Sequence, residues 1–243
     1  MSGTTTLVRV TDLGRVFGAR RALDGVTLEV RDGEAVALLG ANGAGKTTLL
    51  RILATLLRPT RGTASVAGHD VVKAPEAVRG EIGVVAHGAW VYEDLTALEN
   101  VRFWATLAGR AARGDELREA LAQVELDRVA DARARTFSAG MKRRLALARL
   151  ALLRPRVLLL DEPFAGLDQR ARKWLEAHLE SVKARGGALL LATHSFGREL
   201  AVVDRIAILA GGRVALDTPR AALAADTADE VQRLYALHTE EEP

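Results

Sequence analysis

Three short, uninterrupted apolar runs constrain the fold of this chain more than any other feature. They cover residues 35–39, 157–160 and 188–192, and segments with helical periodicity separate them. Strands that are apolar on both faces are typical of parallel sheets that helices cover on both sides. The alternation of such strands with helices therefore predicts an α/β fold with a parallel sheet.

The segments around these runs complete a coarse map of the chain. The further strands are expected within residues 7–40 and 60–86, and in a hairpin formed by 205–210 and 213–216. The helices are expected at 46–57, from about 94 to 152, around 170–185 and in the C-terminal tail. The long helical block interrupts the sheet and is therefore expected to form an inserted subdomain.

Composition excludes several classes of protein. The chain has no cysteine, so a disulfide framework or a thiolate metal site is impossible. No apolar run is long enough to span a bilayer and the N-terminus lacks the pattern of a signal peptide, so we expect a soluble chain that reaches a membrane only through a partner. The net charge of +3 is small for 243 residues and does not indicate nucleic-acid binding.

The first apolar run leads into a phosphate-binding motif. Residues 40–47 read Gly-Ala-Asn-Gly-Ala-Gly-Lys-Thr, directly after the expected strand and before the expected helix. The glycines let backbone amides surround phosphates, Lys46 can reach the β- and γ-phosphates, and the Thr47 hydroxyl can ligate Mg²⁺. A purely structural glycine-rich turn would not need Lys and Thr at this spacing. The expected ATP-binding residues of this phosphate loop are Gly40, Ala41, Asn42, Gly43, Ala44, Gly45, Lys46, Thr47 and Thr48.

The other two runs end in residues suited to catalysis. Asp161 and Glu162 follow residues 157–160, where Asp161 can help to hold Mg²⁺ and Glu162 can orient or deprotonate a water in line with the γ-phosphate. His194 follows residues 188–192. A histidine there is alone more often a core or capping residue, but beside the other motifs it indicates a γ-phosphate contact. Lys46, Glu162 and His194 are thus the candidate catalytic residues.

Together these motifs resemble those of the ATP-binding subunits of ABC (ATP-binding cassette) transporters, over residues 5–220. The resemblance implies a P-loop NTPase core with an N-terminal antiparallel β-subdomain, a helical subdomain inserted at about 92–152, and a helical tail at 221–243. It implies an ATPase that uses ATP and Mg²⁺. It also implies an integral membrane transporter subunit as partner, no nucleic acid, and a cytoplasmic position on the inner face of the membrane.

Further site residues follow from this resemblance. Ser138, Ala139, Gly140 and Met141 correspond to the signature loop, at a helix N-terminus that can bind an anion. The family pairs two cassettes head to tail, so in a homodimer this loop would cap the γ-phosphate of ATP bound by the second copy. Ala139 stands for a glycine, which is tolerable if its φ is negative, and Met141 stands for a glutamine, which removes a polar contact.

Three further positions correspond to functional residues of the family, and two of them also allow a purely structural role. Asp168 corresponds to the D-loop, and Phe17 to an aromatic that stacks on adenine, although Phe17 could equally pack in the core. His87 stands where the family has the Q-loop glutamine. It could contact a water near the metal or γ-phosphate, or be a hydrogen-bonded loop residue.

Four aromatics cluster in a segment that, in the family, lines a groove for a helix of the membrane subunit. They are Trp90, Tyr92, Phe103 and Trp104. Alternatively they form the core of the helical insert. Phe103 and Trp104 are neighbours on one expected helix and cannot both face inward, so at least one should be exposed or at an interface.

Within the family, residues 87–100 and 137–149 look most like haem exporters of cytochrome c biogenesis. A drug, lipid or peptide exporter is the alternative. ABC-type ATPases that act on DNA or ribosomes form a different class. Only about 90 residues separate the phosphate and signature loops, no sustained heptads occur, and there is one set of motifs, which disfavours that class. Glu162 and His194 argue against a purely regulatory clamp.

Overall fold

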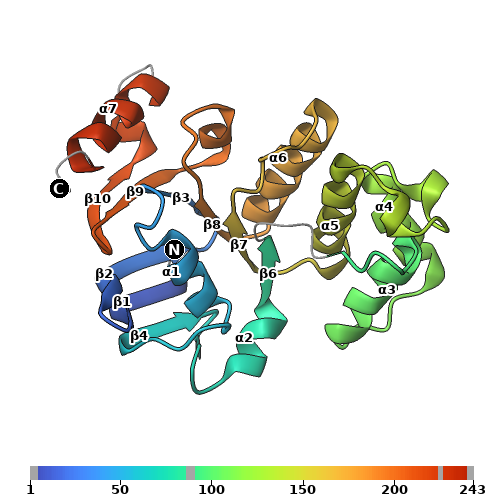
Figure 1. Ribbon diagram of the computed structural model, residues 1–243, viewed down its shortest axis with the longest axis horizontal. Coiled ribbons are helices and arrows are strands. Elements are labelled where there is room, and N and C mark those ends of the chain that lie inside the picture. Colours follow the sequence, from blue (N-terminus) through green and yellow to red (C-terminus); the bar gives the residue numbers. More distant parts are fainter. Residues whose placement is uncertain (1–4, 86–90, 224–226, 240–243) are drawn as a thin grey trace.

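The computed structural model describes residues 5–85, 91–223 and 227–239, which form two β-sheets and a group of helices projecting from one side (Figure 1). The strands are β1 (Thr6–Phe17), β2 (Arg20–Arg31), β3 (Ala35–Leu39), β4 (Arg61–Val66), β5 (His69–Asp70), β6 (Ile82–Val85), β7 (Val157–Asp161), β8 (Ala188–Ala192), β9 (Arg205–Ala210) and β10 (Arg213–Pro219). The helices are α1 (Lys46–Leu53), α2 (Pro75–Glu81), α3 (Ala97–Leu107), α4 (Gly114–Gln123), α5 (Ala139–Leu153), α6 (Gln169–Ala184) and α7 (Thr227–Thr239). Short 3-10 turns occur at Asp127–Val129, Ala134–Thr136, Arg198–Val202 and Arg220–Ala222.

The larger sheet has the order β10-β9-β3-β8-β7-β6, and its strands are parallel except for β10. Alternate side chains of β7 enter two different hydrophobic clusters. Leu158 and Leu160 belong to one, and Val157 and Leu159 belong to the other. A strand buried on both faces must be apolar at every position, so the prediction of a parallel α/β core from the three apolar runs is confirmed.

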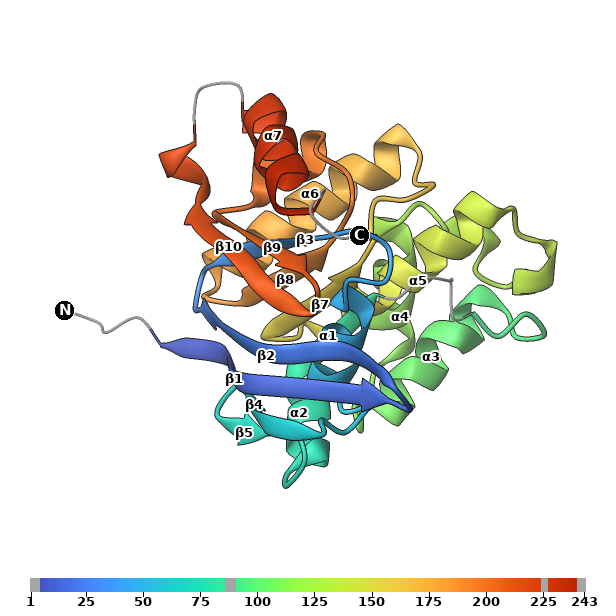
Figure 2. The ribbon, with the colours of Figure 1, turned by 60° about the vertical axis from the view of Figure 1, so that its left-hand side comes forward.

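The smaller sheet is antiparallel and has the order β2-β1-β4-β5. Its long strands β1 and β2 lie side by side in Figure 2. Helix α1 contacts β2, β4 and β7, so it is packed between the two sheets. This arrangement places the start of α1 close to the turn between β1 and β2.

Helices α3, α4 and α5 pack against one another, and Figure 1 shows them on the opposite side of the molecule from the antiparallel sheet. A capping box starts α3, in which the Thr96 side chain accepts from the Glu99 amide and the Glu99 side chain accepts from the Thr96 amide. Leu117, Leu121 and Leu145 are completely buried between the helices. The helices lie within the block that the sequence predicted to be helical.

Two expectations about local structure were wrong. The helix expected at 46–57 ends at Leu53, because Thr55 adopts a left-handed φ of 62°. The amides of Thr55 and Leu56 donate to the carbonyls of Ile52 and Arg51, which is the hydrogen-bond pattern of a Schellman motif. Residues 60–86 also contain a helix, α2, and Val78 is its one buried residue, so it leaves almost no apolar periodicity.

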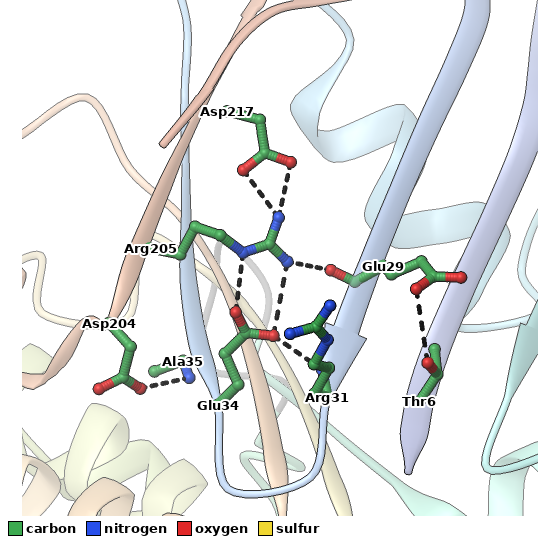
Figure 3. A network of polar contacts seen from close by, with 8 residues as sticks. All are labelled: Thr6, Glu29, Arg31, Glu34, Ala35, Asp204, Arg205 and Asp217. Atoms are coloured by element: carbon green, nitrogen blue, oxygen red, sulfur yellow. Dashed lines mark hydrogen bonds and ion pairs between the residues drawn. The ribbon is translucent and has the colours of Figure 1, made fainter. Parts of the chain in front are cut away.

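A network of charged side chains binds the amino-terminal edge of the parallel sheet together (Figure 3). The Arg205 guanidinium, on β9, donates from Nε to Glu34 Oε1 at 2.7 Å and from Nη1 to both oxygens of Asp217. It also donates to the backbone carbonyl of Glu29. Nearby, the Asp204 carboxylate accepts from the Ala35 amide at 2.8 Å. These contacts join the β2–β3 turn to β9 and β10.

In the part of the chain that the structure describes, no helix is long and apolar enough to cross a membrane.

Candidate nucleotide-binding site

The predicted motif residues converge at the carboxyl ends of three neighbouring parallel strands. The phosphate loop follows β3, Asp161 ends β7 and His194 follows β8, and β8 lies between β3 and β7. Ligands bind at this edge in open α/β sheets. A pocket of about 650 Å³ opens there, lined by Phe17, Arg20, Ala22, Asn42, Gly43, Gly45, Lys46, Thr47, Thr48, Asp161, Glu162 and His194.

Glycines determine the path of the phosphate loop. Gly43 and Gly45 have φ values of 88° and 110°, which side-chain-bearing residues rarely adopt. A Cβ on Gly45 would also lie 2.4 Å from the carbonyl oxygen of Ala22. Gly45 precedes α1, and no side chain caps this helix. The first amides of a helix have no partner within it, so the start of α1 offers N–H donors to an anion in the pocket.

Not every residue of the predicted loop faces the pocket. Gly40, Ala41 and Ala44 are absent from its lining. The Ala44 amide donates to the Ala41 carbonyl at 3.1 Å, and a Cβ on Gly40 would lie 2.5 Å from the Leu209 carbonyl oxygen. These residues therefore shape the loop.

Lys46 is buried at the bottom of the loop, with 7% of its surface exposed. Its Nζ donates to the Gly40 carbonyl at 2.5 Å and to the Ala41 carbonyl at 3.1 Å. Burial lowers the pKa of Lys46, although the charges of Glu162 and Asp161 oppose this shift. The ammonium group is thus desolvated and bonded to neutral carbonyls. A phosphate group would stabilise its charge by a charge-assisted hydrogen bond.

The two predicted metal-binding residues are in contact. The Thr47 hydroxyl donates to Asp161 Oδ2 at 2.8 Å, which joins the start of α1 to the end of β7. A hydroxyl and a carboxylate are hard oxygen donors, and Mg²⁺ is usually bound by one or two such groups together with phosphate oxygens and water. The described residues contain no cluster of three or more His, Cys, Asp or Glu side chains that could hold a metal by itself. The donors present fit Mg²⁺ bound together with a nucleotide.

Glu162 and His194 form a hydrogen-bonded pair at the same edge. Glu162 Oε1 lies 2.6 Å from His194 Nδ1 and accepts from the His194 amide at 2.9 Å. The Thr193 hydroxyl donates to Glu162 Oε2 at 3.2 Å. Glu162 itself has a positive φ of 50°, a conformation that is costly for a residue with a side chain and tends to occur at functional sites. The carboxylate is therefore held in one orientation beside the pocket.

The aromatic position has the exposure expected of a binding residue. Phe17 lines the pocket and is 44% exposed, so the alternative that it packs in the core is wrong. The Arg15 guanidinium lies 4.5 Å from the centroid of its ring, a cation–π distance that supports the ring position. Stacking on adenine stays a prediction.

The signature loop lies away from this pocket, because Ser138 to Met141 are absent from its lining. Ser138 caps α5, and its hydroxyl accepts from the Met141 amide at 3.2 Å. Ala139 is helical and its φ is not positive, so the substitution of a glycine there causes no backbone strain. The Met141 side chain packs against the hydrophobic cluster that contains Leu158 and Leu160, which is called the main core below. A glutamine would be less favourable there.

Asp168 also lies outside the pocket lining and has a local structural role. It caps α6, and its Oδ1 accepts from the Ala171 amide at 2.8 Å. Arg144, which follows the signature loop on α5, places its Nε 3.9 Å from Asp168 Oδ2. The D-loop position and the signature helix are therefore in contact within one chain.

The aromatic cluster divides between core and surface. Trp104 is 5% exposed and belongs to the main core, so its expected place in a partner groove was wrong. Tyr92 is 50% exposed and makes an edge contact with the partly buried Phe103 ring. Phe103 and Trp104 both contact the same hydrophobic core and neither is fully exposed, so the prediction that at least one of them would be exposed or at an interface is not confirmed. Trp90 and His87 lie outside the described residues.

Sequence inspection missed two pocket residues, Arg20 and Ala22. Both lie on β2, two residues apart, so they face the same side of the strand. If Phe17 is a pocket residue, its cross-strand partner Arg20 faces the same way, and so does Ala22 two residues further along β2.

A phosphate loop, an adjoining Thr47–Asp161 pair and an oriented carboxylate, at one edge of a parallel sheet, define the class of P-loop ATPases. Comparison with known proteins then specifies the family. The family model described as "ABC transporter" matches residues 23–165. The chain therefore belongs to the ABC transporter family and is an ATP-binding, ATP-hydrolysing subunit.

Related proteins agree with this assignment. The chain is 38% identical to the daunorubicin/doxorubicin resistance ATP-binding protein DrrA of Streptomyces peucetius, over 95% of this chain and 70% of that protein. It is 39% identical to the sulfate/thiosulfate import ATP-binding protein CysA of Bradyrhizobium diazoefficiens, over 85% of this chain and 62% of that protein. The chain thus spans less than two thirds of that CysA.

Solved structures show the same fold. An ATP-binding subunit of an ABC transporter superposes with a TM-score of 0.82 at 32% identity, over 96% of this chain and 94% of that chain. The ATP-binding cassette MJ0796, solved as a dimer in a post-hydrolysis state bound to ADP and Pi, gives a TM-score of 0.79 at 26% identity, over 88% of this chain and 98% of that chain.

Proposed function

We propose that this chain hydrolyses ATP to drive a separate membrane-embedded subunit of an exporter, from the inner face of the membrane. The observation that carries the proposal is that Lys46, the Thr47–Asp161 pair and Glu162 all line one pocket. The pocket thus combines a cation for phosphates, oxygen donors for a metal and a base for water.

The predicted site residues that line the pocket have separate proposed roles. The amides at the start of α1 and the Lys46 ammonium bind the β- and γ-phosphates. Thr47 and Asp161 hold Mg²⁺, which neutralises phosphate charge when bound. His194 contacts the γ-phosphate while its Nδ1 stays bonded to Glu162. Phe17 stacks on the adenine.

Glu162 acts on the attacking water. Its carboxylate accepts a proton from the water as the water oxygen forms a bond to the γ-phosphorus. The bond between that phosphorus and the oxygen bridging it to the β-phosphate breaks, which releases ADP and phosphate. The hydrogen bonds from Thr193 and the His194 amide hold the carboxylate in place for this step.

The signature loop is proposed to serve a second copy of the chain. Ser138 to Met141 do not line the pocket of their own chain, and the related cassette MJ0796 is a dimer. In a head-to-tail homodimer, the Ser138 hydroxyl and the amides around Gly140 would cap the γ-phosphate of ATP bound by the partner. Catalysis would then need both chains.

Drug export is the transport function that the relatives support best. DrrA of Streptomyces peucetius is named for resistance to daunorubicin and doxorubicin, and DrrA3 of Streptomyces coeruleorubidus, a daunorubicin resistance ATP-binding protein, is 39% identical over 93% of this chain and 70% of that protein. Sulfate import is the alternative, because CysA has a similar identity. The expected likeness to haem exporters has no support among these relatives.

Substitution of Glu162 tests the catalytic proposal. Glu162→Gln keeps the shape of the side chain but removes its basicity, so ATP turnover should fall about 10²–10⁴-fold. ATP binding should persist, and the variant should accumulate as an ATP-bound dimer in gel filtration. Glu119→Gln, at an exposed position on α4, is the matched control and should keep full turnover. Undiminished turnover in Glu162→Gln would show that the base lies elsewhere.

The same variant tests the transport proposal in the host cell. Cells that carry Glu162→Gln in place of the natural chain should retain more daunorubicin than cells with the Glu119→Gln control. Sulfate uptake and haem efflux should be equal in the two strains. Impaired sulfate uptake with normal daunorubicin efflux would favour import, and a selective defect in haem efflux would restore the haem interpretation.

A further inference from the structure

The turn between β1 and β2 brings an arginine to the nucleotide pocket. Phe17 ends β1 and Arg20 begins β2, and the two residues are direct partners in the antiparallel register. Side chains of directly opposed residues project from the same face of a sheet. Phe17 and Arg20 accordingly both line the pocket. The hairpin thus delivers an aromatic ring and a guanidinium group to one site.

The Arg20 side chain lies against the phosphate loop. Its Nη2 donates to the carbonyl oxygen of Gly43 at 3.1 Å. A Cβ on Gly43 would lie 2.8 Å from the same nitrogen, so the guanidinium lies directly over this glycine, whose φ is 88°. A guanidinium has several further N–H groups. Among the described residues, no carboxylate forms an ion pair with Arg20.

The charges of the pocket call for a second cation. Among the described lining residues, Lys46 and Arg20 are the permanent cations. The Lys46 ammonium is bonded to two carbonyls of its own loop and faces the nearby charges of Asp161 and Glu162. A nucleotide triphosphate adds several negative charges to these carboxylates. Mg²⁺ held by Thr47 and Asp161 would offset part of this negative charge, and a further positive group within reach would reduce the repulsion that remains.

We propose that Arg20 is a nucleotide-binding residue whose guanidinium contacts the phosphate chain of the bound nucleotide, bridging it to the Gly43 carbonyl. This inference rests on the proposed function of the pocket as an ATP site. A guanidinium suits the role because it forms charge-assisted hydrogen bonds to phosphate oxygens while keeping a donor for the loop.

The neighbouring residue provides a matched control. Arg21 pairs with Val16 in the register, so its side chain projects from the opposite face of the strand. It does not line the pocket, and its Nη1 lies 3.5 Å from Asp24 Oδ2. Arg20→Gln and Arg21→Gln remove the same charge from adjacent positions of β2. A difference between the two variants therefore reports a local contact and not the net charge of the protein.

Calorimetry of the full chain tests the proposal, with adenosine measured by competition. Arg20→Gln should bind ATP and ADP about tenfold more weakly than the natural chain, because a charge-assisted contact to phosphate is lost. Its affinity for adenosine, which has no phosphate, should be unchanged. Arg21→Gln should bind all three ligands like the natural chain. Both variants should have the same melting temperature without ligand, since both side chains are exposed.

Each other outcome is informative. Equal ATP affinities for Arg20→Gln and Arg21→Gln would overturn the proposal, provided that Lys46→Met loses affinity as expected. An equal loss for ATP and adenosine would also overturn it, because Arg20 would then act through Phe17 and the base. If the natural chain and Lys46→Met bind ATP alike, the proposed nucleotide site itself is wrong, and that failure is distinct from the failure of Arg20.

Discussion

The charged side chains at the two edges of the parallel sheet differ in how completely they are paired. At the amino-terminal edge the Arg205 guanidinium bonds to two carboxylates and a backbone carbonyl (Figure 3). Burial lowers the pKa of Arg205, but the hydrogen bonds to Glu34 and Asp217 and their charges outweigh this effect and raise it. The folded protein therefore stabilises the protonated form of Arg205 more than water does.

At the carboxyl edge the balance is reversed. Burial lowers the pKa of Lys46, and the nearby carboxylates do not overcome that effect. Asp161 accepts from Thr47 and Glu162 binds His194, so neither carboxylate forms an ion pair with Lys46 among the described contacts. This edge keeps charged groups that are desolvated but incompletely paired. Such groups cost stability, and they have bonding capacity left for a ligand.

The difference shows how one sheet can separate stability from function. Completely paired charges join β2, β3, β9 and β10 at one end. Incompletely paired charges face a pocket at the other end. We call the amino-terminal edge, with the Arg205 network, the paired edge, and the carboxyl edge, with the nucleotide pocket, the pocket edge. Substitutions at the paired edge should lower stability and leave activity unchanged. Substitutions at the pocket edge should lower activity and leave stability unchanged.

The largest expected effect on stability follows from Arg205→Met. The change leaves Glu34 and Asp217 without their partner, with side chains that are 17% and 33% exposed. Removing one partner of a fully buried ion pair costs about 3–5 kcal/mol and breaking a surface pair costs less than about 1 kcal/mol. This network is partly buried, so the free energy of unfolding in urea should fall by an amount between these values, about 2–4 kcal/mol. The ATPase rate per folded molecule should stay within about twofold, because the network lies at the edge opposite the pocket.

An exposed ion pair provides the control for Arg205. Arg9 and Glu29 are 59% and 43% exposed and lie 2.9 Å apart. Arg9→Met should cost less than about 1 kcal/mol, as is usual for surface pairs. If Arg205→Met were as mild as Arg9→Met, or if it abolished turnover in folded protein, the separation of the two edges would be wrong.

Lys46→Met should give the opposite combination with a smaller energy. Loss of the phosphate contact should weaken ATP binding by about 1.5–3 kcal/mol, or about tenfold or more. The free energy of unfolding without nucleotide should stay the same or rise slightly, because a desolvated charge is replaced by an apolar side chain of similar length. Calorimetry and urea unfolding of the same preparation measure both quantities. A large loss of stability would show that Lys46 also supports the fold.

Much of the pocket edge was predictable because its residues are encoded locally. Lys46, Asp161 and His194 each follow an apolar run, and parallel strands bring their carboxyl ends to one edge whatever the distance along the chain. The paired edge gave no such signal. Glu34 and Arg205 are 171 residues apart, and charged residues at strand ends look like ordinary surface positions.

The remaining errors also have physical causes. Arg20 follows a tight turn, and its place at the pocket depends on cross-strand register with Phe17. The early end of α1 depends on a left-handed Thr55, which is rare for a residue with a β-branched side chain. Trp104 was expected in the groove but lies in the core, because an aromatic side chain on a helix suits either position.

The smallest expected effect is a dependence of stability on pH, which arises at His178 on α6, outside both edges of the sheet. Helix α6 begins directly after the D-loop position, and in its last turn Lys183 donates to Asp204, near the amino-terminal edge of the sheet. The His178 ring stacks on Trp174 with 4.9 Å between the ring centroids, and its buried Nε2 has no hydrogen-bond partner among the residues that the structure describes. Burial, assisted by the charge of Arg185, lowers the pKa of His178 to about 4.

Between about pH 6.5 and 4 the unfolded chain therefore binds a proton at His178 that the folded chain does not. Stability from this residue is complete above about pH 6.5 and declines as the pH falls, by about 1–2 kcal/mol between pH 7 and pH 5. Urea unfolding at the two pH values should show this loss in the natural chain and a smaller one in His178→Gln. His69→Gln, at an exposed position on β5, should behave like the natural chain. Equal losses in all three proteins would place the acid sensitivity elsewhere, and if the loss vanished only in Arg205→Met, the paired edge would be responsible for it.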